Sequence, residues 1–246
     1  MEKFNYYRKL WHLVGLIIPV LFYLDPFNGA LGLEHASRAI VFSILFLNTV
    51  LLSIIEVLRL NFQSINENFW TYFGKLMKEQ EKGRITATLP YILSNAFVVA
   101  FFPAELACLS MCFLLIGDPS AAFFGSKYGK FRFKNGKSRA GVVAFIGASF
   151  VSGLLLMLLF ANSNGNPFYA LYANNALNHI GIIIMLAGVL SAAAAEFYSG
   201  HAWNGFLDDN LTIPFASSIV MVVLTILFYN IGSLDQVIFP VTEMFR

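Results

Sequence analysis

The chain has 246 residues, and its composition excludes an ordinary soluble domain. Apolar residues make up 58% of the chain, charged residues 12%, and 26 positions are phenylalanine, far from the balance of soluble proteins. The net charge is only +2, and we expect no nucleic-acid partner. The two cysteines, Cys108 and Cys112, are too few for a disulfide framework or a metal cluster. The composition therefore predicts an integral membrane protein.

Several apolar runs approach or exceed the roughly 18 to 20 residues that a helix needs to cross a bilayer. A segment inside lipid must satisfy its own backbone hydrogen bonds, which favours helices. We therefore predict an all-α, polytopic transmembrane helix bundle that forms one domain over residues 1–246. We expect about seven spans, at residues 10–24, 38–60, 86–102, 104–124, 141–161, 178–199 and 211–231.

The cations are distributed unevenly between alternate connections. The segments before the first span, between the second and third, and between the fourth and fifth carry all but two of the 16 Lys and Arg residues. The opposite set carries only Arg38 and Arg246. Short cytoplasmic loops carry such an excess. The pattern predicts a multi-pass protein with its amino terminus in the cytoplasm and its carboxyl terminus outside.

At the amino terminus, Arg8 and His12 are four residues apart, on one face of a helix, at the cytoplasmic end of the first span. They are either interfacial side chains that extend toward water or part of a phosphate-binding edge.

The second span ends with Glu56 and Arg59, which are three residues apart. A carboxylate at this depth needs a partner or water, so Glu56 is either an ion-pair partner of Arg59 or a ligand for a metal or substrate. Residues 61–85 follow as the longest polar connection. Their interleaved aromatic residues and lysines favour an interfacial amphipathic helix on anionic lipid, and a solvated loop is the alternative.

The fourth span leads into a stripe of small residues. Asp118, Ala122, Gly125 and Gly129 recur at helical spacing, so they form one face with a carboxylate at its head. Such a face admits either a neighbouring backbone or a phosphate chain.

The basic loop after this stripe contains Gly136, Lys137 and Ser138, which resemble the end of a P-loop. That motif needs a glycine five residues before Gly136, where this chain has Phe131, and it needs a preceding strand. We therefore exclude a P-loop fold. Glycine N–H groups and lysine can still bind phosphate here, although a basic loop is also the ordinary result of membrane orientation.

Acidic residues occur again near the last two spans. Glu196 ends the sixth span, and Asp208, Asp209 and Asn210 precede the seventh. Helix capping explains one of these acids but leaves the others without a structural reason. The predicted topology brings the charged residues of the chain to one boundary, namely Arg8, His12, Glu56, Asp118, Lys137, Glu196, Asp208 and Asp209.

Carboxylates beside cations suggest Mg²⁺, which binds one or two acids together with substrate phosphates. Phosphoryl or nucleotidyl transfer depends mainly on positioning and charge neutralisation. A site embedded in the membrane implies that the acceptor is a membrane lipid.

Several sequence blocks also resemble the CTP-dependent lipid kinases, which include dolichol, phytol and diacylglycerol kinases. The matching blocks, in the same order, are Arg8-Lys9 with His12, Glu56 with Arg59, residues 117–129 with Lys137, Ser138 and Gly141, and Glu196 with residues 208–214. The resemblance implies a multi-span catalytic domain that transfers the γ-phosphate of CTP to the hydroxyl of a lipid alcohol (a polyprenol, a phytol-like alcohol or diacylglycerol) with the help of Mg²⁺.

The same resemblance implies roles for individual residues. The catalytic residues would be Asp118, Lys137, Asp208 and Asp209, with Asp208 and Asp209 binding a second metal or orienting the lipid hydroxyl. The metal ligands would be Asp118, Asp209, Glu196 and Glu56. The CTP contacts would come from Arg8, His12, Arg59, Gly117, Gly125, Lys127, Gly129, Lys137, Ser138 and Asn210.

One departure keeps other functions open. Many members of the family carry a glutamate, a glycine and a serine shortly after the lysine and serine, whereas this chain has Arg139, Ala140, Gly141 and Val142. A CDP-lipid synthase, similar to the phosphatidate cytidylyltransferases, is the first alternative. A non-enzymatic lipid-binding or transport protein is the second. The sequence does not specify an oligomeric state.

Overall fold

The computed structural model describes residues 13–163, 165–200 and 202–246, and almost all of its regular structure is helical. The helices are α2 (Ile17–Leu24), α3 (Ala36–Asn61), α4 (Gln63–Phe73), α5 (Thr88–Phe101), α6 (Ala104–Cys112), α7 (Asp118–Tyr128), α8 (Arg139–Asn162), α9 (His179–Tyr198) and α10 (Asp209–Tyr229). A two-residue antiparallel hairpin, β1 (Tyr172–Ala173) and β2 (Ala176–Leu177), precedes α9. The predicted helical fold class is confirmed.

Within the described residues, five helical segments are long and apolar enough to cross a membrane. They are α3, the continuous segment Ala104–Tyr128, α8, α9 and α10, and the shorter α5 is also apolar. These helices fit a membrane protein. The predicted first span, 10–24, lies partly outside the described residues. Its described part contains the short helix α2. The count of seven spans and the cytoplasmic amino terminus therefore stay predictions.

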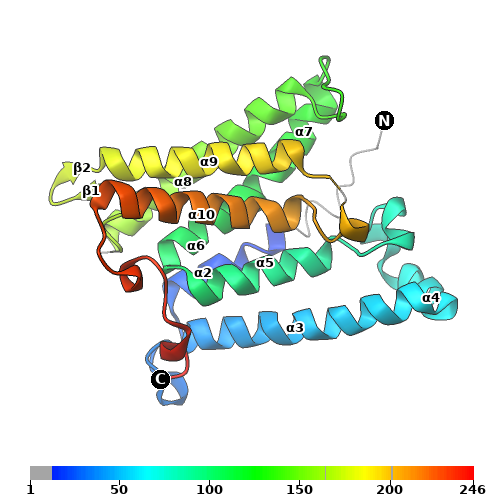
Figure 1. Ribbon diagram of the computed structural model, residues 1–246, viewed down its shortest axis with the longest axis horizontal. Helices are drawn as coiled ribbons and strands as arrows, with labels where there is room; N and C mark the ends of the chain where they lie inside the picture. The colour runs from blue at the N-terminus through cyan, green and yellow to red at the C-terminus, as the bar shows by residue number, and fades with distance from the viewer. Residues whose placement is uncertain (1–12, 164, 201) are drawn as a thin grey trace.

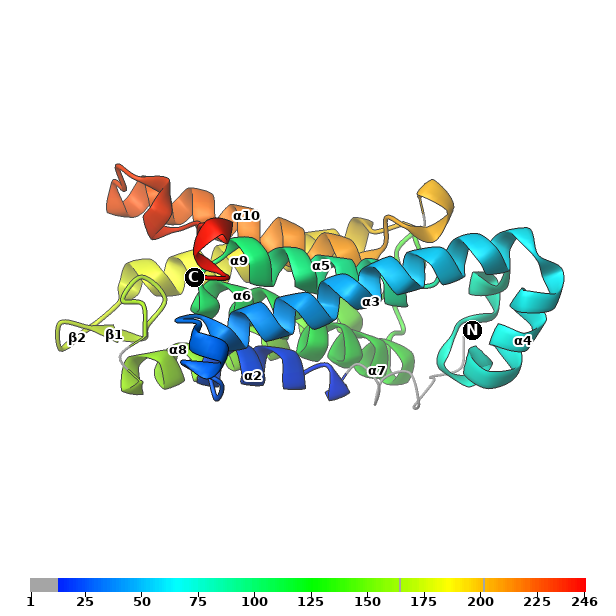
Figure 2. The ribbon, with the colours of Figure 1, turned by 90° about the horizontal axis from the view of Figure 1, so that it is seen from below.

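The centre of the bundle is α6. Its residues from Glu105 to Cys112 are all buried, and α2, α8 and α10 pack around it. Cys108 and Cys112 are therefore packing residues, as their apolar setting predicts. On the outside, α9 and α10 run side by side, and α3 runs along one edge of the bundle (Figures 1 and 2). A helix that is apolar on all sides can be enclosed by its neighbours, as α6 is here.

The connections gather at two ends of the bundle. The α4 region, the tip of α7 and the turn between α9 and α10 lie at one end, on the right in Figure 1. The β hairpin, the start of α3 and the carboxyl terminus lie at the other. The described cationic segments, 59–84 and 127–139, are at the first end, while Arg38 and Arg246 are at the second. The cations are thus separated between the two ends, whereas the side of the membrane on which each end lies stays a prediction.

The small-residue stripe on α7 is covered by α8. A Cβ atom added to Gly125 would lie 3.0 Å from Ser138 Oγ, and one added to Gly141 would lie 3.0 Å from the carbonyl oxygen of Ala121. The two helices can therefore approach closely only because these positions lack side chains. Of the two roles that the stripe allows, backbone contact is the one that the structure contains.

A π-helical turn, Phe113–Gly117, joins α6 to α7. Such turns are rare and often occur at functional sites. Gly117 ends the turn against α8, and a Cβ atom at this position would lie 2.5 Å from Ser149 Oγ and 2.8 Å from the Phe145 ring. This contact fixes the start of α7, and therefore fixes Asp118.

We predict that Gly117→Ala destabilises the fold by about 1–3 kcal/mol, because the added methyl group overpacks the contact with α8. The measurement is the apparent melting temperature of the purified protein in detergent. Gly147→Ala on α8 is the matched control, since nothing lies within 4 Å of the added atom. Equal melting temperatures for the two variants would contradict the packing role.

Candidate functional site

A short hairpin-like turn brings Lys137 to the end of α9. Phe133 N donates to the carbonyl oxygen of Lys137 at 2.8 Å, and Gly136 turns the chain with a φ of +83°. The side chain of Asn135 donates to the carbonyl oxygen of Phe197 at 2.7 Å, which ties the turn to α9. Lys137 Nζ then reaches Glu196 Oε1 at 2.5 Å, and these two side chains are 29% and 6% exposed.

The charges of three carboxylates act on this lysine. Burial lowers the pKa of Lys137, but the nearby charges of Asp209, Glu196 and Asp118 outweigh it, so the net pKa is raised above the ordinary 10.5. Lys137 is therefore protonated at neutral pH. A lysine whose pKa is higher in the folded protein than in the unfolded chain stabilises the fold at pH values below its pKa in the unfolded chain. This contribution is lost as the pH rises through the pKa of the lysine in the folded protein, in strongly alkaline solution. Lys137 thus pairs directly with Glu196 of α9 and is within electrostatic range of Asp118 of α7 and Asp209 of α10.

The start of α10 is fixed by its own polar residues. Asp208 caps the helix, because its carboxylate accepts from Leu211 N at 3.2 Å. The buried Asn210 side chain donates to Asp208 Oδ2 at 2.8 Å and to Asp209 Oδ1 at 3.2 Å. Ser94 of α5 donates to the carbonyl oxygen of Asn210 at 2.9 Å. Asp208 therefore has a structural role, whereas Asp209 lies half-buried on the first turn.

A small polar depression adjoins these acids. It is lined by Asp208, Asp209 and Gly205 on one side and by Glu81, Arg84, Ile85 and Ala87 on the other. Ile85 N donates to the carbonyl oxygen of Asn204 at 2.9 Å, and a Cβ atom at Gly205 would lie 2.9 Å from the carbonyl oxygen of Ile85. The connection before α5 is thus in backbone contact with the connection before α10.

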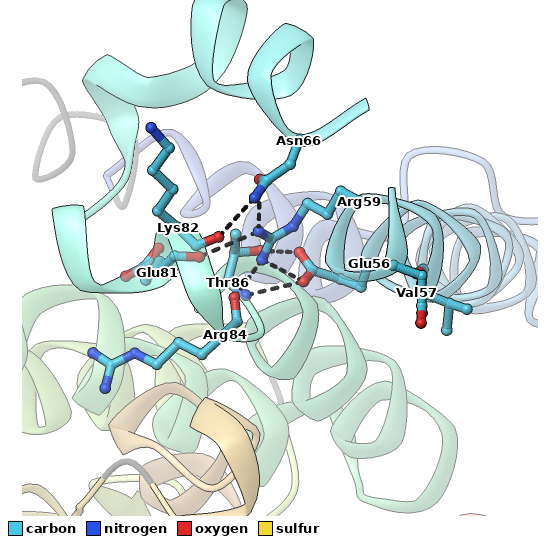
Figure 3. Close-up of polar contacts among 9 residues, drawn as sticks. Glu56, Val57, Arg59, Asn66, Glu81, Lys82, Arg84 and Thr86 are labelled. Atoms are coloured by element: carbon cyan, nitrogen blue, oxygen red, sulfur yellow. Dashed lines mark hydrogen bonds and ion pairs between the residues drawn. The ribbon is translucent and has the colours of Figure 1, made fainter. Parts of the chain in front are cut away.

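Glu56 and Arg59 form a separate buried network (Figure 3). Arg59 Nη2 pairs with Glu56 Oε2 at 2.6 Å, and Glu56 Oε1 accepts from Thr86 Oγ1 at 2.7 Å. Arg59 also donates to the carbonyl oxygens of Glu81, at 3.2 Å, and Arg84. The ion pair, one of the two predicted roles, is present. Metal binding by Glu56 or phosphate binding by Arg59 would require these hydrogen bonds to break.

The remaining predicted nucleotide contacts do not form one cluster with Lys137. Ser138 Oγ caps α8 by accepting from Gly141 N at 3.0 Å, and Gly125 and Gly129 pack against Ser138. Lys127 is exposed, 5.7 Å from the centre of the Phe123 ring. Arg8 and His12 lie outside the described residues.

Sequence reasoning missed the residues that support the site. Asn135, Asn66 and Thr86 hold the basic turn and the connection before α5 by side-chain hydrogen bonds, and no spacing pattern indicated them. Among the residues that the structure describes, no group of three or more His, Cys, Asp or Glu side chains could hold a metal ion.

The fold and the site together define a helical membrane protein with a lysine and several carboxylates at one end of its bundle. No protein-family model and no solved structure matches the chain. An uncharacterized protein of Rickettsia prowazekii is 28% identical over 210 residues, which cover 84% of this chain and 88% of that protein.

Two fungal relatives have a named activity. The CTP-dependent diacylglycerol kinase 1 of Saccharomyces cerevisiae is 29% identical over 184 residues, which cover 70% of this chain and 60% of the kinase. The protein of the same name from Eremothecium gossypii is 28% identical over 177 residues, which cover 68% and 53%. The chain thus matches less than two thirds of the length of either kinase. These similarities confirm the resemblance to the CTP-dependent lipid kinase family.

We predict a coupling free energy of about 1–2 kcal/mol between Lys137 and Glu196 in a double-mutant cycle with Lys137→Met and Glu196→Gln. Truncating one partner leaves the other charge in a poorly solvated place, and the double variant avoids that cost. The measurement is unfolding in detergent. The exposed pair Glu243 and Arg246, which are 38% and 77% exposed, should couple by less than about 0.5 kcal/mol. Equal coupling in the two pairs would count against a buried Lys137 site.

We also predict that Arg59→Lys speeds amide hydrogen exchange in residues 63–85 by about tenfold or more. Lysine keeps the charge but cannot reproduce the several hydrogen bonds of the guanidinium. The measurement is hydrogen exchange followed by mass spectrometry. Arg84→Lys is the control, because Arg59 uses only the backbone oxygen of Arg84. Unchanged exchange in Arg59→Lys would mean that another contact holds the connection.

Proposed function

We propose that the chain is a CTP-dependent lipid kinase that transfers the γ-phosphate of CTP to the hydroxyl of a membrane lipid alcohol. The observation that carries this proposal is the ion pair of Lys137 with Glu196, which lies within electrostatic range of Asp118 and Asp209. The names of the fungal relatives support CTP as the donor and diacylglycerol as the first acceptor to test. A polyprenol and a phytol-like alcohol are further candidate acceptors within the same class.

The residues of this group divide the work of the reaction. Lys137 contacts the phosphates and neutralises their charge, and Glu196 holds the lysine in position. Asp209 orients the lipid hydroxyl and accepts its proton. The lipid oxygen attacks the γ-phosphorus, the bond from that phosphorus to the β-phosphate oxygen breaks, and CDP leaves with its electron pair. The products are CDP and a phosphorylated lipid.

Asp118 would hold Mg²⁺. Its carboxylate suits this ion, which commonly takes one or two acids and completes its coordination with phosphates and water. When bound, Mg²⁺ would neutralise charge on the transferred phosphate. Glu56 has no part in this proposal, since both of its carboxylate oxygens accept hydrogen bonds from Arg59 and Thr86.

The proposal includes a topology. The whole chain is one catalytic domain of the membrane, its amino terminus is cytoplasmic, and the site faces the cytosol, which supplies CTP. The gathering of cationic segments at the end that contains Lys137 supports this orientation.

The direct test uses CTP labelled at either the α- or the γ-phosphate, with Mg²⁺ and diacylglycerol, polyprenol or phytol in proteoliposomes. We expect the γ-label on the lipid. Transfer of the α-label with release of pyrophosphate would instead identify a CDP-lipid synthase, and the kinase proposal would then be wrong. No transfer to any alcohol would favour a lipid-binding or transport protein.

We predict that Asp209→Asn and Asp118→Asn each lower kcat/KM by at least about 100-fold, a loss of about 2.7 kcal/mol in transition-state stabilisation. The amide keeps the size of the side chain but removes the charge. Asp235→Asn is the control, because Asp235 is exposed near the opposite end of the bundle and should leave turnover within about twofold. Activity within threefold of wild type in Asp209→Asn would remove that residue from the mechanism.

A further inference from the structure

A largely apolar groove of about 360 Å³ lies beside the polar depression. Its walls include Leu52 and Ile55 of α3, Phe69 and Phe73 of α4, and Ile92 of α5. Figures 1 and 2 show α5 alongside α3, and α4 at the carboxyl end of α3. The volume and the few polar groups are those of a pocket for a small-molecule ligand or part of one.

The groove is continuous with the site. Glu81 and Ala87 line both the groove and the depression that contains Asp208 and Asp209. Asn210, which bonds to both aspartates, also lines the groove. An occupant therefore has an apolar part between α3, α4 and α5 and a polar end beside the acids.

The groove also lies along a helix that is long and apolar enough to cross a membrane. In α3, which is long enough to span a membrane, only 17% of the most apolar 18-residue stretch is buried. Most of this stretch is therefore not covered by the rest of the protein. Along α3 the lining extends from Ile55 back to Asn48, which corresponds to about 10 Å at the rise of an α-helix. An amphiphile from the bilayer can thus insert part of its chain here and leave the remainder in the membrane.

We infer that this groove binds the hydrocarbon chain of the acceptor lipid and presents its hydroxyl to Asp209. The inference rests on the proposed function for the identity of the acceptor. A partner helix would match the apolar walls but has no single polar group to place beside the aspartates. A lipid with a small hydroxyl head matches both ends of the groove.

The experiment narrows the groove and measures the two substrates separately. Ile55→Trp places a larger side chain in the wall and so reduces the volume of the groove. Ala87→Phe blocks the passage between the groove and the depression. We expect each variant to raise the KM for diacylglycerol at least tenfold and to leave the KM for CTP within twofold. Ile54→Trp is the matched control, since Ile54 is 53% exposed on the same helix and does not line the groove. Equal lipid KM values in all three variants would overturn the inference.

A binding measurement separates this inference from the proposed function. A diacylglycerol with a diazirine in one acyl chain is photolysed with the intact protein in proteoliposomes, and labelled peptides are mapped with and without excess unlabelled diacylglycerol. We expect competed labelling in residues 48–55, 69–77 and 86–92, reduced in Ile55→Trp. Such labelling without kinase activity would refute the proposed function and retain the groove. Competed labelling elsewhere, or none, would refute the groove even if the protein is an active kinase.

Discussion

The buried guanidinium of Arg59 is the interaction on which the site end of the structure depends. Arg59 is 1% exposed, and a buried charge without partners costs several kcal/mol. Glu56 supplies the opposite charge from the same helix, but its carboxylate cannot accept hydrogen bonds from all five N–H donors of the Arg59 guanidinium. The other acceptors are oxygens of the connection between α3 and α5. This connection must therefore fold back over the end of α3.

That fold-back has two consequences for the surface. It brings Phe69 and Phe73 of α4 against α3, where they form one wall of the apolar groove. It also places Glu81 and Arg84 opposite Asp208 and Asp209, where they form the edge of the polar depression. The hydrogen bonds that the buried Arg59 requires thus position both the apolar groove and the polar depression next to the acids.

The long apolar runs allowed the sequence to predict α8, α9 and α10 to within about two residues at each end. The region 86–124 was harder. Its two predicted spans correspond to a short α5 and a segment, Ala104–Tyr128, that is interrupted by a π-helical turn. Apolar content does not specify that turn, nor the close tertiary contact of Gly117 with Ser149 and Phe145 of α8 at its end. The position of Asp118 depends on this contact.

Orientation reasoning predicted that Asp118, Glu196 and Asp209 lie at one boundary, and in the structure the charges of all three act on Lys137. Spacing could not show which charges are satisfied locally, so it grouped Glu56 and Arg59 with them. It also could not show that α8 covers Gly125. A spacing pattern identifies a helix face, but the partner of that face is decided by packing between distant segments.

The Lys137–Glu196 pair lies next to the start of α8. Gly141 is in the first turn of this helix, and a side chain there would meet the carbonyl oxygen of Ala121. The carboxylate bonded to Lys137 comes from the end of α9. Glu196 uses only one of the three ammonium donors of Lys137, so a phosphate that binds the other donors leaves the ion pair intact and leaves no buried carboxylate without a partner.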